Sequence, residues 1–329
     1  MPDYAVFGGW LRSSLRLPEL RPHPGGDDAA PDWTLTVASP EPLDGARRLG
    51  AQHYAGDVEV ALLAAGDSWR VATSDIGDFD ITNGGRHLTW RPTAGAREDL
   101  ARFDLLGRVL PLALHRLGAL PLHGSSVVLP HGPAVAFLAP KGHGKSTLAV
   151  ALAQAGGRLL SDDVTVLDGM AADGAVPGDT GSRVRARPGV QAVRLWADSA
   201  RWLRTDAYGA PDTIGRKLVL PHLPESLLAR AAAPVHGVYL LTATAPDAGA
   251  VAERRSLGER EATVALVRQV TAGGLLGGSE GALVLARAAA VARAVPVYAL
   301  SVARDFDRLG AVVQAVLAWH APRPAAAHA

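Results

Sequence analysis

Residues 134–157 constrain the fold of this chain more than any other stretch. Apolar residues predict a strand at Ala134–Leu138, and the strand runs directly into the glycine-rich loop Ala139-Pro-Lys-Gly-His-Gly-Lys-Ser-Thr147. Apolar residues then recur at helical spacing until Gly156-Gly157, a typical helix end. A strand, a glycine-rich turn and a helix that starts at Lys-Ser are the parts of a phosphate-binding loop.

The residue types in this loop suit the binding of phosphate. Gly142 and Gly144 let the backbone aim successive N–H groups at phosphate oxygens, and the start of a helix adds the positive end of its dipole. Lys145 offers a charge for the outer phosphates of a nucleoside triphosphate, and the Ser146 hydroxyl suits Mg²⁺. Because Ala139 replaces the usual first glycine, the flanking strand and helix support the prediction more than the motif does. The predicted nucleotide-binding residues of the loop are Lys141, Gly142, His143, Gly144, Lys145, Ser146 and Thr147.

Lysine is rare in the chain, which draws attention to the places where it occurs. Of 33 lysines and arginines, only Lys141, Lys145 and Lys217 are lysine. A compact ammonium group fits a crowded phosphate site that a planar guanidinium does not. Two of these lysines lie in the glycine-rich loop, so Lys217 becomes a further candidate for a phosphate contact. The alternative is an ordinary surface lysine.

Candidate catalytic side chains flank the loop on both sides. The next predicted strand ends in Asp162-Asp163, and in a parallel sheet that end lies at the same edge as the loop. One carboxylate could hold Mg²⁺ while the other takes the proton of an acceptor hydroxyl. A pair that caps a turn is the alternative. His123 precedes a strand that a Pro-His-Gly-Pro turn joins to the strand before the loop, so an antiparallel hairpin would place His123 beside the loop.

Composition excludes several classes of function. The formal net charge of +1 gives no electrostatic reason to expect a nucleic-acid or membrane-surface protein. The absence of cysteine excludes disulfides and thiolate metal sites and favours a reducing cytoplasm. The N-terminus lacks the pattern of a signal peptide, and no apolar run is long enough for a membrane-spanning helix. We therefore expect a cytoplasmic protein without nucleic-acid or membrane partners. A homo-oligomer is compatible with the sequence.

The predicted elements divide the chain into four parts. Residues 1–95 read as a β-rich N-terminal domain, with strands at Trp33–Val37, Val58–Leu62 and Trp69–Ala72 and a hairpin around Asn83-Gly84-Gly85. Residues 96–118 read as a connecting helix that Pro111 breaks or kinks. Residues 119–320 form the expected phosphate-loop core, and 321–329 a flexible tail.

The second half of the core alternates strands and helices in its pattern. Strands are predicted at Val235–Thr242 and Val295–Val302, and helices at 279–293 and Asp305–Trp319. Ser256-Leu-Gly-Glu259 reads as a capping box that opens a helix to about Val270.

The order of residues around the loop resembles the HPr kinase/phosphorylase family. The resemblance rests on Leu-His123-Gly124, the hairpin, the loop and Leu-Leu-Ser-Asp162-Asp163, over about 119–168. It implies an α/β fold with a phosphate-loop kinase core of the HPr kinase/phosphoenolpyruvate carboxykinase type, and a kinase that phosphorylates a serine hydroxyl with Mg²⁺ and ATP.

The resemblance also implies roles for individual residues. By position, Lys145 would bind the β- and γ-phosphates and Ser146 the metal. Asp162 resembles the acid/base carboxylate, Asp163 its partner on the metal side, and His123 a histidine near the transferred phosphoryl group. The residues themselves leave open which of the two aspartates is the base. Lys217 would correspond to a late phosphate contact.

The departures from the family concern the substrate. The Glu-x-Arg-Gly signature of the enzymes that act on HPr is absent; Arg185-Ala-Arg-Pro-Gly189 occupies its approximate place. Arg183, Arg185 and Arg187 could approach a substrate, although a solvated basic strand is the favoured interpretation. The N-terminal region looks more like that of HPr-kinase-like proteins associated with ribosomally made peptides, including lasso-peptide precursors. We therefore expect a precursor peptide, rather than HPr, as acceptor.

Other functions remain compatible with the same residues. The chain could be a kinase of a small-molecule hydroxyl, or a non-catalytic binding module gated by a nucleotide. The Asp162-Asp163 pair argues against the binding module, because binding alone needs no base. Carboxykinase-like chemistry has no support outside the shared core. The sequence does not distinguish ATP from GTP.

Overall fold

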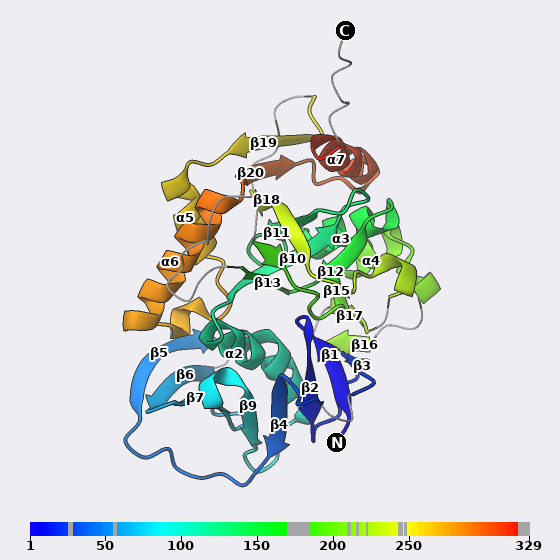
Figure 1. The fold of residues 1–329 in the computed structure, drawn as a ribbon. Helices are drawn as coiled ribbons and strands as arrows, with labels where there is room; N and C mark the ends of the chain where they lie inside the picture. The colour runs from blue at the N-terminus through cyan, green and yellow to red at the C-terminus, as the bar shows by residue number, and fades with distance from the viewer. Residues whose placement is uncertain are drawn as a thin grey trace.

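The computed structural model describes residues 1–25, 29–54, 58–169, 184–208, 212–214, 217–221, 223–242, 246 and 249–321. These residues form a mixed α/β molecule built on three sheets (Figure 1). The predicted tail lies almost wholly outside the described residues. No helix in the described part is both long enough and apolar enough to cross a membrane.

A nine-stranded sheet occupies the lower half of the molecule in Figure 1. Its order is β3-β1-β2-β4-β9-β8-β7-β6-β5, and a short 3₁₀ turn, Asn83–Gly85, joins β8 to β9. The strands predicted from period-2 patterns are all present, and the hairpin at Asn83 is antiparallel as expected. The strands are β1 (Asp3–Val6), β2 (Gly9–Ser13), β3 (Arg21–Pro22), β4 (Trp33–Val37), β5 (Arg47–Tyr54), β6 (Val58–Ala65), β7 (Ser68–Thr73), β8 (Asp78–Thr82) and β9 (His87–Arg91).

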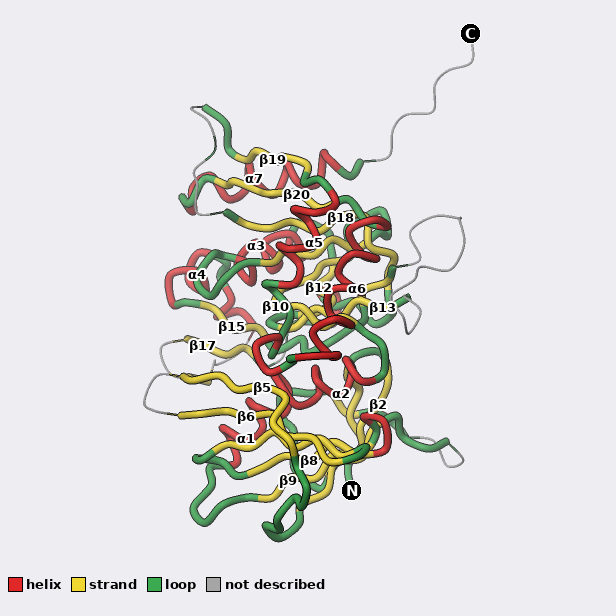
Figure 2. Tube along the Cα trace, turned by 90° about the vertical axis from the view of Figure 1, so that its left-hand side faces the viewer, coloured by secondary structure: helices red, strands yellow, loops and turns green. Residues whose placement is uncertain are grey.

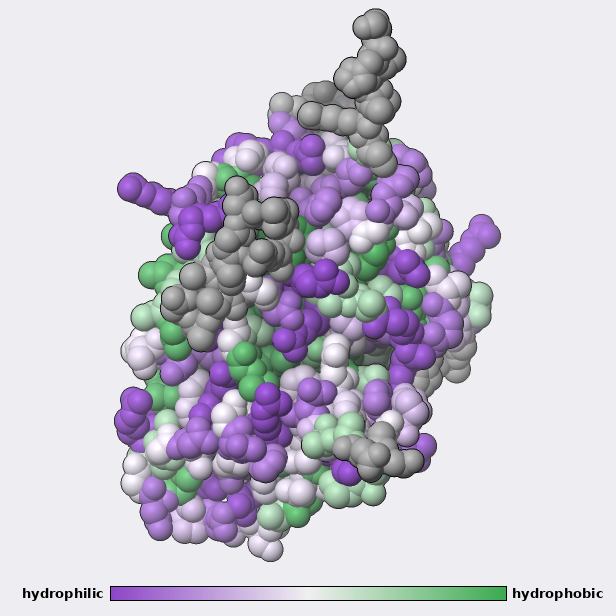
Figure 3. Space-filling model, viewed as in Figure 1, coloured by the Kyte–Doolittle hydropathy of each residue, from purple (hydrophilic) through white to green (hydrophobic). Residues whose placement is uncertain are grey.

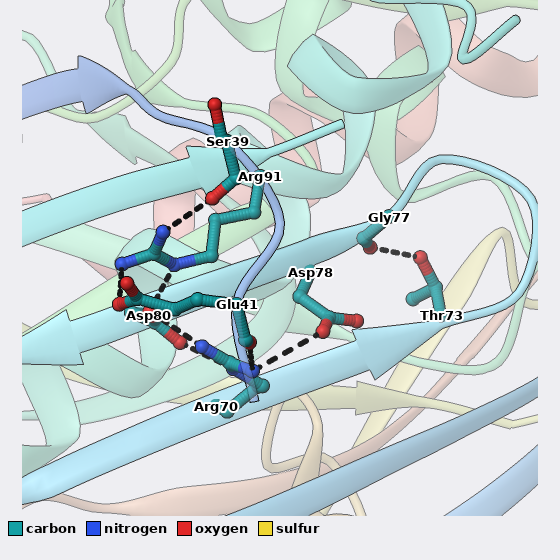
Figure 4. A network of polar contacts seen from close by, with 8 residues as sticks. All are labelled: Ser39, Glu41, Arg70, Thr73, Gly77, Asp78, Asp80 and Arg91. Atoms are coloured by element: carbon teal, nitrogen blue, oxygen red, sulfur yellow. Dashed lines mark hydrogen bonds and ion pairs between the residues drawn. The ribbon is translucent and has the colours of Figure 1, made fainter. Parts of the chain in front are cut away.

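A network of charged side chains joins neighbouring strands of this sheet (Figure 4). Arg70 on β7 donates two hydrogen bonds, of 2.6 and 2.9 Å, to the carboxylate of Asp80 on β8. Arg91 on β9 donates a third, of 2.7 Å, to the same carboxylate. Although burial alone would raise it, the two guanidinium groups hold the pKa of Asp80 below its usual value. Every charge at the centre of this network is therefore paired inside the protein.

The connecting helix contains a wide turn near its middle. It consists of α1 (Glu98–Asp104), a π-helical turn (Leu105–Val109, the π turn) and α2 (Leu110–Arg116). Pro111 was expected to break or kink the helix, but the helix continues to Arg116. The Leu110 N–H bonds to Leu105 O five residues back. The wider spacing just before Pro111 fits a residue that has no N–H to donate.

The second sheet carries the glycine-rich loop. Its order is β11-β10-β13-β14-β18-β20-β19, with β12 also paired to β10, and β11 pairs with β18 as well, so five strands close a ring. The strands are β10 (Leu120–Val128), β11 (Ala134–Leu138), β12 (Arg158–Ser161), β13 (Val164–Asp168), β14 (Arg185–Ala186), β18 (Ala233–Leu241), β19 (Ala252–Ser256) and β20 (Val297–Val302).

A third, small sheet and five helices complete the core. The sheet has the order β15-β17-β16, with β15 (Val193–Leu195), β16 (Asp212–Ile214) and β17 (Lys217–Leu220). The helices are α3 (Lys145–Gln154), α4 (Ala197–Trp202), α5 (Glu259–Val267), α6 (Gly278–Ala294) and α7 (Phe306–Trp319). Short 3₁₀ turns lie at Thr205–Tyr208, Glu225–Leu227 and Gly273–Leu275. Figure 2 shows β5 and β6 projecting beneath β17 on one side of the molecule.

Two expectations about the core need correction. The sheet is mixed rather than parallel: β10 runs antiparallel to both β11 and β12 and lies between them. Since β12 still runs in the direction of β11, its end reaches the same edge as the glycine-rich loop. Ser256 does not cap a helix. It ends β19 opposite Tyr298, and Gly258 precedes α5 without a side-chain cap.

Apolar burial unites the two halves of the molecule. One cluster of buried residues runs from the nine-stranded sheet through the connecting helix into the second sheet, and another lies between β11, α3 and α7. On the face drawn in Figure 3, hydrophilic and hydrophobic residues are interspersed, without a broad apolar area. The connecting helix is therefore held between the halves and reaches the edge where the loop lies.

Candidate functional site

The glycine-rich loop depends on two glycines in the left-handed region of backbone space. Gly142 has φ +88° and Gly144 has φ +85°, values that other residues rarely adopt. A Cβ at either position would meet nothing within 4 Å, so backbone conformation rather than crowding selects glycine. Gly144 directly precedes α3, and the N–H groups of this first turn lack helical partners. The loop therefore has the backbone that an anion site requires.

Lys145 lies buried at the start of α3. Its Nζ donates to Ala139 O at 2.7 Å and Pro140 O at 3.2 Å, and lies 3.2 Å from His123 Nε2. Burial lowers the pKa of this ammonium group to about 8, although Asp162 and Asp163 act in the opposite sense. No carboxylate of the described chain lies within ion-pair distance of Nζ. Within the described residues, the ammonium group of Lys145 is therefore hydrogen-bonded only to neutral groups.

His123 lies between the lysine and the aspartates. Its Nδ1 lies 3.1 Å from Asp163 O, an acceptor, so Nδ1 carries the proton and Nε2 accepts from Lys145. Burial, followed by the charge of Lys145, lowers the pKa of the imidazole, which is therefore neutral at neutral pH. The hairpin places His123 as expected, because Gly124 pairs with Leu138 at the end of β11.

The two aspartates occupy different environments. Asp162 is 1% exposed; it accepts a 2.6 Å hydrogen bond from Ser125 Oγ and a 3.3 Å bond from Arg194 N. Asp163 has φ +68°, an unusual conformation for a non-glycine residue, and its carboxylate is about one-third exposed. Arg194 Nη1 bonds to Asp163 Oδ2 at 3.1 Å, and His123 Nδ1 lies 3.6 Å from Oδ1. Backbone strain of this kind often marks a functional position.

These side chains meet around one large cavity, the main cavity. Its volume is ≈ 680 Å³. It gathers the predicted residues Lys141–Thr147, His123, Asp163 and Lys217, while Asp162 lies outside its lining. Lys217 Nζ lies 5.8 Å from the centre of the Trp196 ring, and burial lowers the pKa of Lys217. The cavity is also lined by Tyr54, Phe103, Asp104, Gly107, Arg108, Arg194, Leu195 and Trp196.

A smaller apolar cavity adjoins the loop. It has a volume of ≈ 300 Å³ and shares Gly142, His143, Gly144, Thr147 and Trp196 with the main cavity. Most of its remaining wall is apolar, and Ser199 at its edge accepts a 3.0 Å hydrogen bond from Thr147 Oγ1. The apolar wall consists of Leu148, Leu241, Val302, Ala303, Phe306, Leu309 and Val312.

Sequence reasoning missed the side of the main cavity that faces the N-terminal region. Phe103, Asp104 and Arg108 come from the connecting helix, and Tyr54 from the end of β5; only their packing brings them to the loop. Arg194 and Trp196 were not predicted as residues of the site either. Their sequence signal is slight, because a short apolar strand with one arginine is common.

The arginines considered as substrate contacts have other partners. Arg187 bonds to Asp168 at 2.5 Å, and Arg185 bonds to Ala232 O. Neither lines the main cavity. Arg183 lies outside the described residues.

The predicted Mg²⁺ would have to bind at a site with few protein ligands. Within the described ranges no group of three or more His, Cys, Asp or Glu is arranged to hold a metal ion. Mg²⁺ commonly takes only one or two carboxylates or hydroxyls and fills its shell with phosphates and water. Ser146 and the two aspartates therefore fit Mg²⁺ that arrives with a nucleotide.

The comparisons with known proteins are sparse. No family model matches the chain, and no curated protein matches it. Among solved structures, the chain is similar to the Hpr(Ser) kinase/phosphatase from Coxiella burnetii, with 13% identity and a TM-score of 0.31. The match covers 61% of this chain and 95% of that one. A likeness of this size carries no argument about activity, so the geometry of the site has to support the function.

Proposed function

We propose that this protein is a Mg²⁺- and ATP-dependent kinase that phosphorylates a serine hydroxyl of a peptide. One observation carries the proposal: a buried lysine at the start of a helix, with no carboxylate partner among the described residues, shares a cavity with a neutral histidine and a strained aspartate. A binding loop alone needs the lysine but not the other two. Phosphoryl transfer needs all three functions, since it depends on positioning and electrostatic stabilisation.

The chain's own residues would divide the work as follows. Loop N–H groups and Lys145 bind the outer phosphates, and the neutral Nε2 of His123 orients the ammonium group. Asp163 takes the proton of the acceptor hydroxyl. The acceptor oxygen then bonds to the γ-phosphorus, the bond to the bridging oxygen breaks, and ADP leaves with that electron pair.

We assign the base to Asp163 rather than Asp162, the reverse of what the resemblance implies. Asp163 lines the main cavity, whereas Asp162 is buried and hydrogen-bonded by Ser125. A general base must reach the proton that it abstracts. Ser146 would hold Mg²⁺, and Asp162, whose carboxylate lies outside the lining of the main cavity, would act on the ion through water. When bound, Mg²⁺ neutralises charge that develops on the phosphates.

The apolar cavity supports a nucleoside triphosphate over inorganic polyphosphate. It adjoins the loop at Gly142–Gly144 and offers Trp196 and Phe306 to a flat base. Apolar walls with a few polar groups are the usual surroundings of a nucleoside. The expected ligand therefore has a base next to its phosphates. ATP is proposed from the family resemblance.

A labelling experiment tests the proposal. The purified protein is incubated with γ-³²P-ATP, Mg²⁺ and, in separate arms, a pool of serine-containing peptides or a small-metabolite extract. We expect label in peptides, as phosphoserine. Label in a metabolite would replace the peptide by a small-molecule acceptor.

Two controls test whether transfer depends on Lys145 and on Mg²⁺. Lys145→Met should abolish transfer, and omission of Mg²⁺ should do the same. Nucleotide binding with neither transfer nor hydrolysis in any arm would overturn the kinase and favour the nucleotide-gated binding module.

A further inference from the structure

The wall of the main cavity that comes from the N-terminal region has features that nucleotide binding does not explain. Asp104 is buried in the connecting helix, and burial raises the pKa of its carboxyl. One oxygen, Oδ1, pairs with Arg108 Nη1, while Oδ2 is buried and has no hydrogen-bond partner in the part of the chain that the structure describes. The guanidinium of Arg108 lies 5.1 Å from the centre of the Tyr54 ring. Asp104, Arg108 and Tyr54 all line the main cavity.

A purely structural role accounts poorly for this pair. A buried ion pair rarely stabilises a fold more than apolar side chains would, because both charges lose water. What the pair does achieve is orientation: Asp104 and the Tyr54 ring fix the plane of the guanidinium. Across the described ranges, no other hydrogen bond engages the donors of Arg108. Its Nε and Nη2 groups therefore remain available at the cavity.

The π turn contributes to this placement. Arg108 lies within the turn and Asp104 directly before it, and both reach the cavity together with Gly107. Such turns are rare and are frequently found at functional sites. Here the turn sits where the connecting helix meets the phosphate-binding edge. The local distortion of the helix thus coincides with its only charged pair at the cavity.

The wall begins next to the proposed base. Phe103 packs on Arg194, whose guanidinium lies 4.3 Å from the ring centre, and Arg194 holds Asp163. Arg108 follows about one helical turn later, roughly 6–8 Å along the axis at about 1.5 Å per residue. One residue of extended chain spans about 3.3–3.6 Å. The axial rise from Phe103 to Arg108 thus corresponds to about two residues of extended chain, and on this basis we place a group bound to Arg108 one or two residues from a hydroxyl at Asp163.

The charge of the cavity indicates the sign of that group. Five cationic side chains line it against two carboxylates: Arg108, Lys141, Lys145, Arg194 and Lys217 against Asp104 and Asp163. Three of the cations are the lysines proposed for phosphate, and Arg194 is engaged by Asp163. Arg108 also pairs with a carboxylate, that of Asp104, but only through Nη1 and away from the proposed base. Its remaining donors can meet another anion, and the planar fork of arginine suits a carboxylate.

We propose that Arg108 is the specificity-determining residue for the acceptor, and that it binds a carboxylate one or two residues from the serine that is phosphorylated. The inference rests on the proposed kinase function, since it places the acceptor at Asp163. The carboxylate belongs to an acidic side chain or to the C-terminus of the peptide. Tyr54 and Asp104 act through Arg108 and are positioning residues.

Matched peptides test the inference. Fluorescein-labelled nonapeptides with a single serine are made in pairs: aspartate or asparagine after the serine, and a free or amidated C-terminus next to it. Affinity is measured by fluorescence anisotropy with a non-hydrolysable ATP analogue and Mg²⁺, and transfer by γ-³²P-ATP. In at least one pair the acid should bind about 10- to 100-fold more tightly than the amide, the usual range for a charge-assisted bond. The pair that responds identifies the source of the carboxylate.

The variants are compared by the ratio of the affinity for the acidic peptide to the affinity for its amide partner. A general loss of structure would weaken both affinities and leave this ratio unchanged. Arg108→Gln combined with Asp104→Asn removes the pair without leaving a buried charge unpaired, and should bring the ratio to about one. Arg108→Lys keeps the charge without the fork and should reduce the ratio at least about threefold. Arg102→Gln is the matched control, because Arg102 lies on the same helix as Arg108, pairs with Glu19 of the N-terminal region and does not line the cavity.

Each outcome decides one of the two proposals. A wild-type ratio near one in both pairs, or a ratio that survives in the double variant, overturns the role of Arg108. If the double variant does not fold, an unchanged ratio in Arg108→Lys overturns it instead. Arg108-dependent binding without any transfer would leave the recognition site standing and overturn the kinase. Phosphoryl transfer without a preference for the acidic peptide would leave the kinase standing and overturn the role of Arg108.

Discussion

Two clusters of charged side chains lie within this molecule, and they are satisfied in opposite ways. In the nine-stranded sheet, Asp80 receives three hydrogen bonds from Arg70 and Arg91. At the edge that carries the glycine-rich loop, the hydrogen bonds of Lys145 Nζ within the described residues go only to carbonyl oxygens and an imidazole. In the first cluster the charges are paired within the protein, whereas in the second the charge of Lys145 can still pair with a ligand. The contrast separates charges that hold a fold together from charges that bind and react.

The largest effect is expected when the proposed general base of the second cluster, Asp163, is replaced. Asp163→Asn should reduce phosphoryl transfer by about 10²–10⁴, the usual contribution of a general base, while nucleotide still binds. Initial rates with γ-³²P-ATP and the best peptide measure the effect. Asp163 is partly exposed, so we expect little change in the urea midpoint. Asp162→Asn is the companion variant, and transfer that depends on Asp162 but not on Asp163 would reverse our assignment.

The first cluster should respond to mutation in stability. Asp80→Ala leaves two buried arginines without their shared partner, and breaking a buried pair typically destabilises by about 3–5 kcal/mol. Urea unfolding followed by circular dichroism measures the loss. Asp67→Ala is the control, because Asp67 is largely exposed in its pair with Arg116, and such a pair should contribute at most about 1 kcal/mol. Equal losses in the two variants would remove the distinction between the clusters.

A smaller effect should appear as a pH dependence of nucleotide binding. The ammonium form of Lys145 binds phosphate, and its pKa of about 8 means that the charge is lost as the pH rises. Between pH 7 and pH 9 the charged fraction falls from about nine-tenths to one-tenth, so the Kd for MgATP should rise about tenfold. His123 is neutral throughout this range. Isothermal titration calorimetry checks the slope, which should be shallower in Lys145→Met; an affinity that is flat in the wild type would contradict the burial effect.

The smallest effect concerns a residue that only orients the site. Ser125→Ala removes the 2.6 Å hydrogen bond to Asp162 without touching the main cavity. A single hydrogen bond is worth about 0.5–1.5 kcal/mol, so kcat should fall about two- to tenfold. Ser126→Ala offers a comparison on the same strand, since Ser126 Oγ is buried without a partner. A fall as large as that of the aspartate variants would give Ser125 a more direct part.

The sequence predicted the part of the main cavity around the glycine-rich loop far better than the wall that the connecting helix supplies. The glycine-rich loop, the hairpin that carries His123 and the end of β12 all follow from local patterns within 120–168. Their placement needed no knowledge of distant packing. Which aspartate faces the cavity could not be predicted, because it depends on the left-handed backbone of Asp163 and on Arg194.

Errors in the fold prediction have the same origin. Ser256 has the spacing of a helix cap, but β20 takes it into a sheet through its pairing with Tyr298. Pro111 was expected to break or kink the helix; the helix is distorted by the π turn just before Pro111 and then continues through the buried α2. The part of the cavity wall formed by Asp104 and Arg108 depends on that burial, and no sequence motif marks it. Tertiary packing therefore decided what local propensity could not.

Strand β10 has a consequence for the order in which the site assembles. It pairs with β11, β12 and β13, and all four strands lie within one short stretch of chain. Contacts between residues close in sequence form quickly, because little chain entropy is lost in closing them. His123, the loop and both aspartates can therefore come together early, as a nucleus. Arg194 and Lys217 come from strands further along the chain, so we expect the glycine-rich loop to form before the site around it is complete.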